Sequence, residues 1–333
     1  MRKAVLLYNP HSGLDRPRRL ANVERAASVF KNAGIGVCLE PTAGPHSAGL
    51  QARRFVNDGF DTVIACGGDG TVHDVLQGVA GTQGTLGVLP LGTANSLGCD
   101  LGLTRDPERS AQQLLEAESR RIAVGRLEYQ TAAAKRESRY FTVAAGIGAD
   151  AALFYKINAG FKKRWGMMAY VAEALRQWAG DSFHPFSVEW FDTETETKRS
   201  EVVTQLLVVR IANFGGVLKR LAPGAGLLRD DFRLVLFKTK SKARYLRFAT
   251  GRLTGQNWPD TNIELVHASQ VTCLPHLDEQ QQRHCVIHAE ADGEWLGRLP
   301  VTLEMVPNAL NLLIPPSASC LVKKEGTLSS SLA

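Results

Sequence analysis

Three glycines surround a single aspartate in the run Gly67-Gly68-Asp69-Gly70-Thr71. An apolar, β-branched stretch precedes this run and apolar residues at helical spacing follow it, which predicts a strand, a tight turn and a helix. Glycine lets the backbone approach a ligand closely, and the first N–H groups of the helix are free to bind phosphate. Because the Asp69 carboxylate would repel phosphate, the pattern also predicts Mg²⁺ beside it. The alternative is an ordinary glycine-rich turn with a helix-capping acid.

The first 125 residues repeat this order of strand, loop and helix. The repetition predicts an α/β fold with a parallel sheet and helices on both faces, a Rossmann-like nucleotide-binding domain at 1–125. The expected strands are Ala4–Tyr8, Gly36–Leu39, Thr62–Ala65 and Thr85–Pro90, and the expected helices are Pro17–Asn32, Ser47–Asp58, Thr71–Val79 and Pro107–Glu118.

Beyond residue 125, apolar and polar residues alternate in short runs, which is typical of antiparallel strands. We therefore expect an all-β second domain, a β-sandwich at 126–316, with a helical insertion at 151–179 and a flexible tail at 317–333. A chain of 333 residues is long enough for two cores with a cleft between them. The strands expected here are Arg126–Gln130, Arg139–Ala145, Phe186–Phe191, Gln205–Ala212, Phe232–Phe237, Ile263–His267, Gln270–Leu274, Cys285–Ala289, Val301–Val306 and Ala309–Ile314.

Two other small, polar turns follow predicted strands of the first domain. Asn9-Pro10-His11-Ser12-Gly13 comes after the first strand, and Leu89-Pro90-Leu91-Gly92-Thr93-Ala94-Asn95-Ser96 comes at the end of the fourth. In an open α/β sheet, ligands gather at the carboxyl ends of the strands. The three turns are therefore expected to converge on one nucleotide cleft.

Taken together, the three turns resemble the signature of the diacylglycerol kinase catalytic family, which sphingosine and ceramide kinases share. The resemblance covers most of the chain, because this family also has a C-terminal β-sandwich and a late Asp-Gly-Glu, here Asp292-Gly293-Glu294. It implies transfer of the γ-phosphoryl group of ATP, with Mg²⁺, to a lipid hydroxyl. The ATP contacts expected from the turns and the resemblance are Asn9, Pro10, Ser12, Gly13, Thr42, Gly67, Gly68, Asp69, Gly70, Thr71, Val72, His73, Gly92, Thr93 and Asn95.

The resemblance further implies that the catalytic base lies in Asp292-Gly293-Glu294, with Glu294 the first choice and Asp292 the second. A carboxylate within hydrogen-bond reach of the acceptor hydroxyl can take its proton during the transfer. Without the family, Asp-Gly followed by Glu between two strands reads as a hairpin turn, and the same residues can form a turn and supply a base.

Two departures from the family pattern concern metal and substrate. The family holds a second cation in its β-sandwich through an Asp near an Asp-Gly pair and through neighbouring backbone carbonyls. Here the segment reads Leu227-Leu228-Arg229-Asp230-Asp231, with Asp where Gly is usual; Asp230 is the first candidate ligand and Asp231 the second. The third turn reads Asn95-Ser96-Leu97 where the family often has Asn-Asp-Phe, so an acid is missing and we expect a different substrate preference.

Charge and composition bear on partners and location. The formal charge of +6 and the pI near 9.0 fit an acidic lipid, a nucleotide or nucleic acid equally well, but no nucleic-acid-binding module is recognisable and we expect none of that binding. The aromatic, Met- and Lys-rich segment 154–178 suits a membrane surface, although a helix packed on the sandwich would look similar. Six scattered cysteines without an export signal predict a cytoplasmic protein with reduced thiols. From the segment 154–178 we expect this protein to be peripherally attached to a membrane. Whether it forms a homodimer is left open.

Two rival functions remain. A soluble-substrate kinase of the NAD kinase type also uses Gly-Gly-Asp-Gly-Thr, whereas the turns beginning at Asn9 and Leu89 favour the lipid branch. A nucleotide- or lipid-binding regulator that has lost catalysis is the second rival, and retention of Asp69 and Glu294 argues against it.

Overall fold

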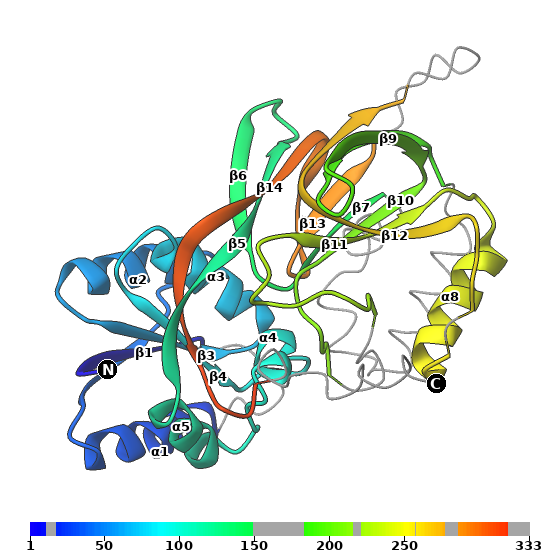
Figure 1. The fold of residues 1–333 in the computed structure, drawn as a ribbon. Helices are drawn as coiled ribbons and strands as arrows, with labels where there is room; N and C mark the ends of the chain where they lie inside the picture. Colours follow the sequence, from blue (N-terminus) through cyan, green and yellow to red (C-terminus); the bar gives the residue numbers. More distant parts are fainter. Residues whose placement is uncertain (11–17, 149–182, 216–220, 257, 277–285, 319–333) are drawn as a thin grey trace, which may run out of the picture.

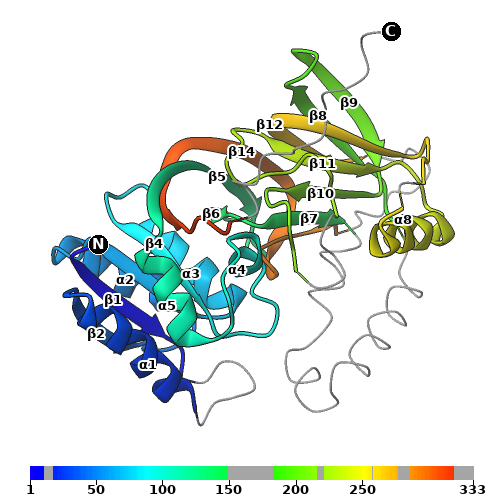
Figure 2. The same cartoon turned by 60° about the horizontal axis from the view of Figure 1, so that its bottom comes forward.

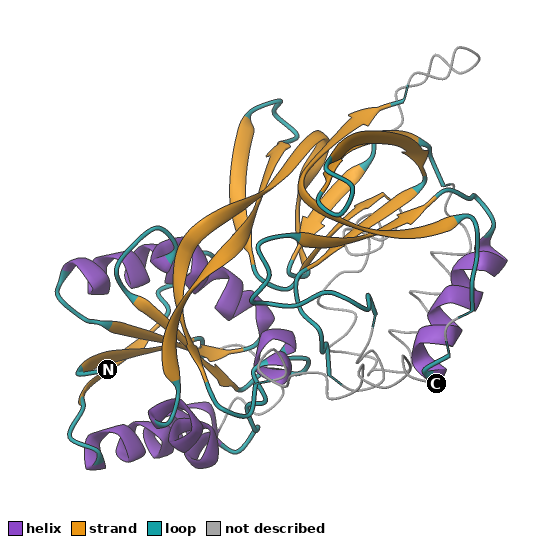
Figure 3. Cartoon of the chain, in the orientation of Figure 1, coloured by secondary structure: helices purple, strands orange, loops and turns teal. Residues whose placement is uncertain are grey.

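A computed structural model describes residues 1–10, 18–148, 183–215, 221–256, 258–276 and 286–318. Ser12 and Gly13 of the first polar turn, the insertion expected at 151–179 and residues 319–333 of the expected tail lie outside these ranges. Figure 3 shows that the helices gather mainly in one half of the molecule and the strands mainly in the other.

Four parallel strands form the sheet of the N-terminal half, in the order β2-β1-β3-β4. Helices cover both faces, with α2 and α3 on one side and α1 and α5 on the other (Figure 1). Every residue of β3 is buried for this reason. The strands are β1 (Lys3–Tyr8), β2 (Gly36–Pro41), β3 (Thr62–Gly67) and β4 (Thr85–Pro90), and the helices are α1 (Arg19–Asn32), α2 (Ala48–Asn57), α3 (Asp69–Val79), α4 (Ser96–Asp100) and α5 (Pro107–Leu115).

The strand order places the predicted turns together. β1 lies between β2 and β3, so the chain runs to one side after β1 and to the other side after β2. The loops that follow β1 and β3 therefore flank the point where the order of the sheet reverses, which is where open α/β sheets bind ligands. The glycine-rich turn leads from β3 directly into α3 at this point.

Antiparallel pairs connect the strands of the C-terminal half, as the alternating pattern predicts. They close a circuit, β14-β13-β7-β10-β11-β12 and back to β14, so that opposite faces pack on one apolar core as sandwich layers do. Phe141 and Phe232 stack in this core with ring centroids 5.7 Å apart. The strands are β5 (Glu118–Gln130), β6 (Arg136–Phe141), β7 (Ala144–Gly148), β8 (Phe186–Asp192), β9 (Thr197–Val203), β10 (Gln205–Val209), β11 (Phe232–Phe237), β12 (Ile263–Pro275), β13 (His288–Ala291) and β14 (Glu294–Ile314).

The two halves share a sheet. β14 pairs along its length with β5, and its last residues continue into the N-terminal sheet, where Asn311 and Leu312 pair with β4 in parallel. The apolar side chains of residues 309–314, which are Ala309, Leu310, Leu312, Leu313 and Ile314, pack in the N-terminal core for the same reason. A division between residues 125 and 126 consequently cuts through β5, and the end of the second half contributes to the first core.

Several features of the C-terminal half differ from the sequence-based expectation. The strand expected at 139–145 is divided between β6 and β7, and β9 was not expected. The strands expected at 263–267 and 270–274 form the single strand β12, with an irregularity between Ala268 and Val271, and those expected at 301–306 and 309–314 are both part of β14. Helix α8 (Lys242–Thr254) was not expected at all. Its Tyr245 ring stacks between Phe183 and Phe237, at centroid distances of 4.6 and 4.5 Å, and anchors the helix to the strands. No helix in the described residues has the length and apolar character needed to cross a membrane.

Candidate functional site

The first turn of α3 begins at the glycine-rich loop, and the loop allows contacts that side chains would block. Gly68 is the N-cap of the helix. A Cβ on Gly67 would lie 2.4 Å from the Thr71 hydroxyl, and one on Gly92 would lie 2.3 Å from the Gly68 Cα. The two glycine turns after β3 and β4 therefore pack backbone against backbone, and only glycine permits this.

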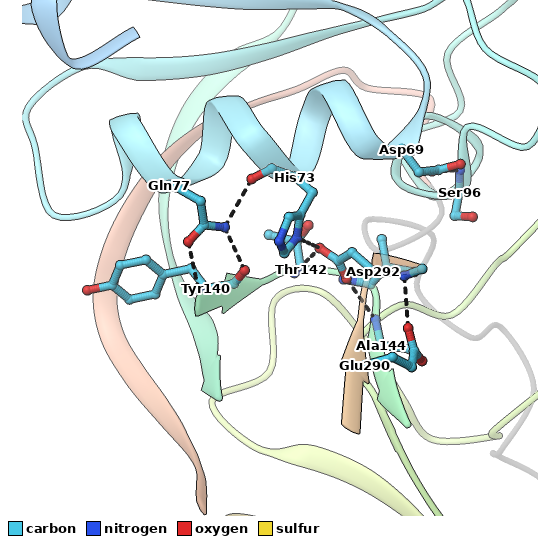
Figure 4. Close-up of polar contacts among 11 residues, drawn as sticks. Asp69, His73, Gln77, Ser96, Tyr140, Thr142, Ala144, Glu290 and Asp292 are labelled. Carbon is cyan, nitrogen blue, oxygen red and sulfur yellow. Dashed lines mark hydrogen bonds and ion pairs between the residues drawn. The ribbon is translucent and has the colours of Figure 1, made fainter. Parts of the chain in front are cut away.

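The Asp69 carboxylate ties these two turns together (Figure 4). Its oxygens accept hydrogen bonds from the backbone N–H groups of Asn95, at 2.9 Å, and Ser96, at 2.6 Å. Asn95 has a left-handed backbone, with φ 57°, and its side chain bonds both backbone groups of Gly92 at 2.8 and 2.9 Å. Burial raises the pKa of Asp69, although these N–H donors act in the opposite direction. The carboxylate thus caps α4 from the neighbouring loop.

Glu294 lies against the glycine-rich loop. A Cβ built on Gly70 would be 2.8 Å from its Oε1 atom, so the carboxylate covers the first turn of α3 next to Asp69. Glu294 is the first residue of β14, and the β13–β14 turn carries it to this position. Within the described residues, no hydrogen bond or ion pair holds its carboxylate. It is available to a ligand at the N-terminus of α3.

Asp292 lies two residues earlier, but its carboxylate is fully engaged. One oxygen accepts from the N–H groups of Val143 at 2.9 Å and Ala144 at 3.1 Å. The other accepts from the Thr142 N–H at 3.0 Å and faces His73 Nδ1 at 3.4 Å. Both His73 and Asp292 are buried. Asp292 therefore fixes the turn to β7 and to α3, as Figure 4 shows, and has little capacity left for a proton from a substrate.

The segment Asp292-Gly293 is also the hairpin turn that the sequence suggested. Both residues have positive φ, 50° for Asp292 and 82° for Gly293, as a two-residue hairpin turn of the primed type requires. The buried Glu290 carboxylate accepts the Gly293 N–H at 3.0 Å. The turn and the position of Glu294 are consequently set by the same hydrogen bonds.

A second link joins α3 to the C-terminal half farther along the helix. The Gln77 side chain donates to the Tyr140 carbonyl at 2.9 Å and accepts the Tyr140 N–H at 2.9 Å (Figure 4). Gln77 is one turn beyond His73, so one face of α3 is fastened to β6 and to the β13–β14 turn. The helix that presents the glycine loop is held between the two halves.

A cleft of about 630 Å³ opens beside this face of α3. His73 and Glu294 belong to its wall, so it extends to the carboxylate that covers the glycine-rich loop. Arg53 and Arg139 supply two cations, neither of which was singled out from the sequence. The remaining lining residues are His46, Gly49, Leu50, Asp74, Gln77, Gly78, Tyr129, Trp295 and Leu296. Two arginines on separate elements, α2 and β6, give no local pattern, which is why only the fold reveals this grouping.

Asp100 is a further residue that sequence reasoning missed. It is the last residue of α4, is fully buried, and its Oδ1 atom accepts the N–H groups of Ala212 at 3.2 Å and Asn213 at 2.9 Å. Its Oδ2 atom is buried and accepts no hydrogen bond from the described residues. Burial raises its pKa to about 6. α4 is thereby held to Asp69 at one end and to the segment after β10 at the other.

The other expected site residues lie near the same edge of the sheet or farther away. Thr42 follows β2 and donates its N–H to the Tyr8 carbonyl at 2.9 Å, close to the end of β1 where Asn9 and Pro10 follow. Thr93 is exposed in the turn after β4. Asp230 and Asp231 lie before β11, away from this loop cluster, and they belong to a different environment described below.

The comparison with protein families agrees with this geometry. The model of the diacylglycerol kinase catalytic domain matches residues 3–127, and the model of the YegS C-terminal NAD kinase beta sandwich-like domain matches residues 141–314. The two matches cover the glycine turns and the β-rich half that carries Glu294. The chain belongs to the diacylglycerol kinase-like family of kinases.

Particular relatives extend over nearly the whole chain. A diacylglycerol kinase of Bacillus subtilis (strain 168) is 28% identical over 95% of this chain and 97% of its own, and one of Staphylococcus aureus (strain MRSA252) is 23% identical over 94% and 93%. The fold resembles the crystal structure of a putative diacylglycerol kinase from Bacillus anthracis, with a TM-score of 0.72, 18% identity and coverage of 95% and 96%. It also resembles yeast NADH kinase complexed with NADH, with a TM-score of 0.52, 11% identity and coverage of 94% and 82%.

Proposed function

We propose that this protein is an ATP- and Mg²⁺-dependent lipid kinase, which transfers the γ-phosphoryl group to the hydroxyl of a lipid of the diacylglycerol or sphingoid type. The observation that carries the proposal is the Glu294 carboxylate, which lies against Gly70 at the start of α3 and has no partner in the described residues. Family membership supports kinase chemistry, and the parallel sheet supports a Rossmann-like nucleotide site.

Glu294 is the proposed catalytic base. It takes the proton of the acceptor hydroxyl while that oxygen attacks the γ-phosphorus and the bond to the departing ADP breaks. General-base assistance of this kind is worth about 10²- to 10⁴-fold in rate. Asp292 is the weaker choice because three backbone N–H groups already occupy its oxygens. Its proposed task is to hold the turn so that Glu294 stays beside the glycine-rich loop.

The two glycine turns form the proposed phosphate site. Free N–H groups at the start of α3 bind the phosphate oxygens, and the absence of side chains on Gly68 and Gly70 lets the phosphates approach. Asp69 is the carboxylate that suits Mg²⁺, whereas Glu294, which flanks the same first turn of α3, is kept for the acceptor proton. When bound, the ion neutralises phosphate charge that the two carboxylates would otherwise repel.

The cleft beside α3 is the proposed entrance for the rest of the nucleotide. Its volume of about 630 Å³ falls within the range of ordinary ligand pockets. Arg139 has no hydrogen bond or ion pair in the described residues, whereas Arg53 already donates to the Ala80 carbonyl at 3.1 Å. Arg139 is therefore the better candidate to bind a phosphate or to stack on the base.

The lipid acceptor requires access to a membrane surface, and we place the protein in the cytoplasm as a peripheral membrane protein. α8 carries a basic, partly apolar exposed side that suits acidic headgroups. Leu246 and the nearby Trp258 are 48% and 40% exposed, and Arg247 is also exposed. This surface lies on the C-terminal half (Figure 2).

The experiment that tests the proposal measures transfer from γ-labelled ATP, with Mg²⁺, into lipid hydroxyl acceptors in mixed micelles. Glu294→Gln is expected to lower turnover about 10²- to 10⁴-fold without lowering the unfolding temperature, since no hydrogen bond is lost. Glu304→Gln, on the same strand but away from the glycine loops, is the control and is expected to keep full activity. Normal lipid phosphorylation by Glu294→Gln would reject Glu294 as the base.

A soluble acceptor is the second candidate function, because the fold also resembles that of yeast NADH kinase. The same assay with NAD in place of lipid separates the two. Label in NAD, and in no lipid, would replace the lipid kinase proposal with a dinucleotide kinase. Nucleotide binding without transfer to either acceptor would instead favour a regulator that has lost catalysis.

A further inference from the structure

Four backbone carbonyls converge on one buried guanidinium in the C-terminal half. Arg210 directly follows β10 and is 1% exposed. One of its terminal nitrogens donates to the carbonyls of Arg229 at 2.6 Å and Asp231 at 2.9 Å. The other donates to the carbonyls of Leu227 at 2.9 Å and Ala123 at 2.8 Å. These four carbonyls are called the carbonyl cage below.

The cage suits a positive charge. Carbonyl oxygens carry partial negative charge and cannot donate, and converging sets of them are typical ligands of hard cations. Burial lowers the pKa of Arg210 to about 10, while the nearby Asp231 and Asp230 act in the opposite direction. The guanidinium is therefore charged at neutral pH, and the cage is already occupied by a cation that belongs to the chain.

The segment that forms the cage is the one for which the sequence suggested a second Mg²⁺. The residues do not fit that ion. Asp231 makes a bidentate pair with Arg229, 2.6 Å at both contacts, and faces His267 Nδ1 at 3.3 Å. Although burial alone would raise the pKa of Asp231, these cationic and hydrogen-bonding partners hold it well below its usual range. The Asp230 side chain is exposed, and no group of three or more His, Cys, Asp or Glu residues in the described chain is arranged to hold a metal.

We propose that Arg210 is the resident cation of the carbonyl cage, and that the cage consequently holds no structural metal ion. The guanidinium draws the segment 227–231 and β5 together, which is the role a bound divalent ion would otherwise fill. The inference goes beyond the proposed function, since it holds whether the acceptor is a lipid or a soluble molecule.

The cage also bears on the position of the site. Two and three residues after Arg210, the N–H groups of Ala212 and Asn213 bind Asp100 at the end of α4. Asp69 holds the other end of that helix. Arg210 is thus a positioning residue: it fixes the start of a connection that runs through α4 to the glycine-rich loop.

The first test uses the wild-type chain without nucleotide. Its unfolding temperature in EDTA is expected to equal that in Mg²⁺ or Ca²⁺. A saturable rise of several degrees with either ion, retained in Asp69→Asn, would show a metal site away from the glycine loops and overturn the proposal.

The second test removes the resident cation. Arg210→Ala leaves four buried carbonyls without donors and is expected to lower the unfolding temperature by at least about 5 °C. Guanidinium at concentrations too low to denature, or Ca²⁺, is expected to restore part of the loss by entering the vacated cage. Arg247→Ala, which removes an exposed arginine of α8, is the control and is expected to show neither the loss nor the rescue. An unchanged unfolding temperature in Arg210→Ala, or a folded variant that neither cation stabilises, would contradict the proposal.

Arg210→Lys keeps the inference testable where the alanine variant does not fold. Lysine retains the charge but places three donors at a single point instead of a planar fork, so it cannot reach all four carbonyls equally well. It is expected to unfold between the wild type and Arg210→Ala and to remain insensitive to EDTA. Stabilisation of this variant by Ca²⁺ to the wild-type level would indicate that the cage prefers a metal ion.

Discussion

Asp69 and Asp292 are both aspartates whose carboxylates accept backbone N–H groups, yet the two regions are built differently. The partners of Asp69, Asn95 and Ser96, lie 26 and 27 residues away within the same α/β half. The N–H partners of Asp292 lie 148 to 150 residues away, across the junction of the two halves. The first region is a local device at the proposed phosphate site, and the second is a long-range joint at the turn that carries the proposed base.

The largest expected effect concerns the local device. Asp69→Asn removes the charge beside the proposed phosphate site and one of the two hydrogen bonds to α4. For both reasons it is expected to lower turnover about 10³-fold, where each factor of ten corresponds to about 1.4 kcal/mol of activation free energy. Asp106→Asn is the matched control, because Asp106 also caps a helix, by accepting the Arg109 N–H at 2.9 Å, but its side chain bonds no residue of the glycine turns in the described chain. Comparable activity losses in both variants would mean that Asp69 acts only by capping a helix.

The joint is expected to show its effect in stability. Asp292→Ala leaves three buried N–H groups without an acceptor, and the free energy of unfolding is expected to fall by about 3 to 5 kcal/mol. Denaturant titration measures the change, with Asp106→Ala as a control expected to lose about 1 kcal/mol. Equal losses would mean that Asp292 contributes no more than an ordinary cap, and the contrast between the two regions would disappear.

Asp100 sharpens the comparison, because it also joins the two halves. Its Oδ1 atom accepts two hydrogen bonds there, whereas its buried Oδ2 atom accepts none from the described residues. Its pKa of about 6 in the folded state lies above the 3.8 of a free side chain, so the unfolded chain releases this proton first as pH rises. The stability that protonated Asp100 gives the folded state is complete below about pH 4 and is lost as the pH rises through about 6. The free energy of unfolding is expected to fall by about 3 kcal/mol over this range. Unfolding of wild type and Asp100→Asn across this pH range tests the expectation. Parallel stability profiles would contradict it.

The smallest expected effect concerns the cleft beside α3 that Arg139 lines. Arg139→Ala is expected to raise the KM for ATP about 10-fold with little change in kcat, because a contact outside the reacting groups contributes to binding more than to the transition state. Arg136→Ala, exposed on the same strand, is the control. An unchanged KM would place the nucleotide elsewhere.

The difference between these regions also explains what the sequence could reveal. Each glycine turn is one continuous run of residues, and glycine itself indicates where the backbone turns tightly. Because such turns separate the strands from the helices, the strands and longer helices of the first half were predicted nearly where they lie. Glu294 was chosen through family resemblance, and its position against Gly70 needed the fold. Arg210 carries no signal: one arginine at the end of a strand is common, and its four carbonyl partners have no side-chain identity. Asp100 likewise becomes notable only because residues 212 and 213 bury it.

The pairing of β14 with β4 has a consequence for how the chain is made. Residues 311 and 312 complete the open edge of a sheet whose other strands all lie before residue 91. During synthesis, the N-terminal sheet leaves the ribosome long before its last neighbour exists, and an unpaired edge invites wrong partners. Completion of the N-terminal half is therefore delayed until the β-rich half has been translated.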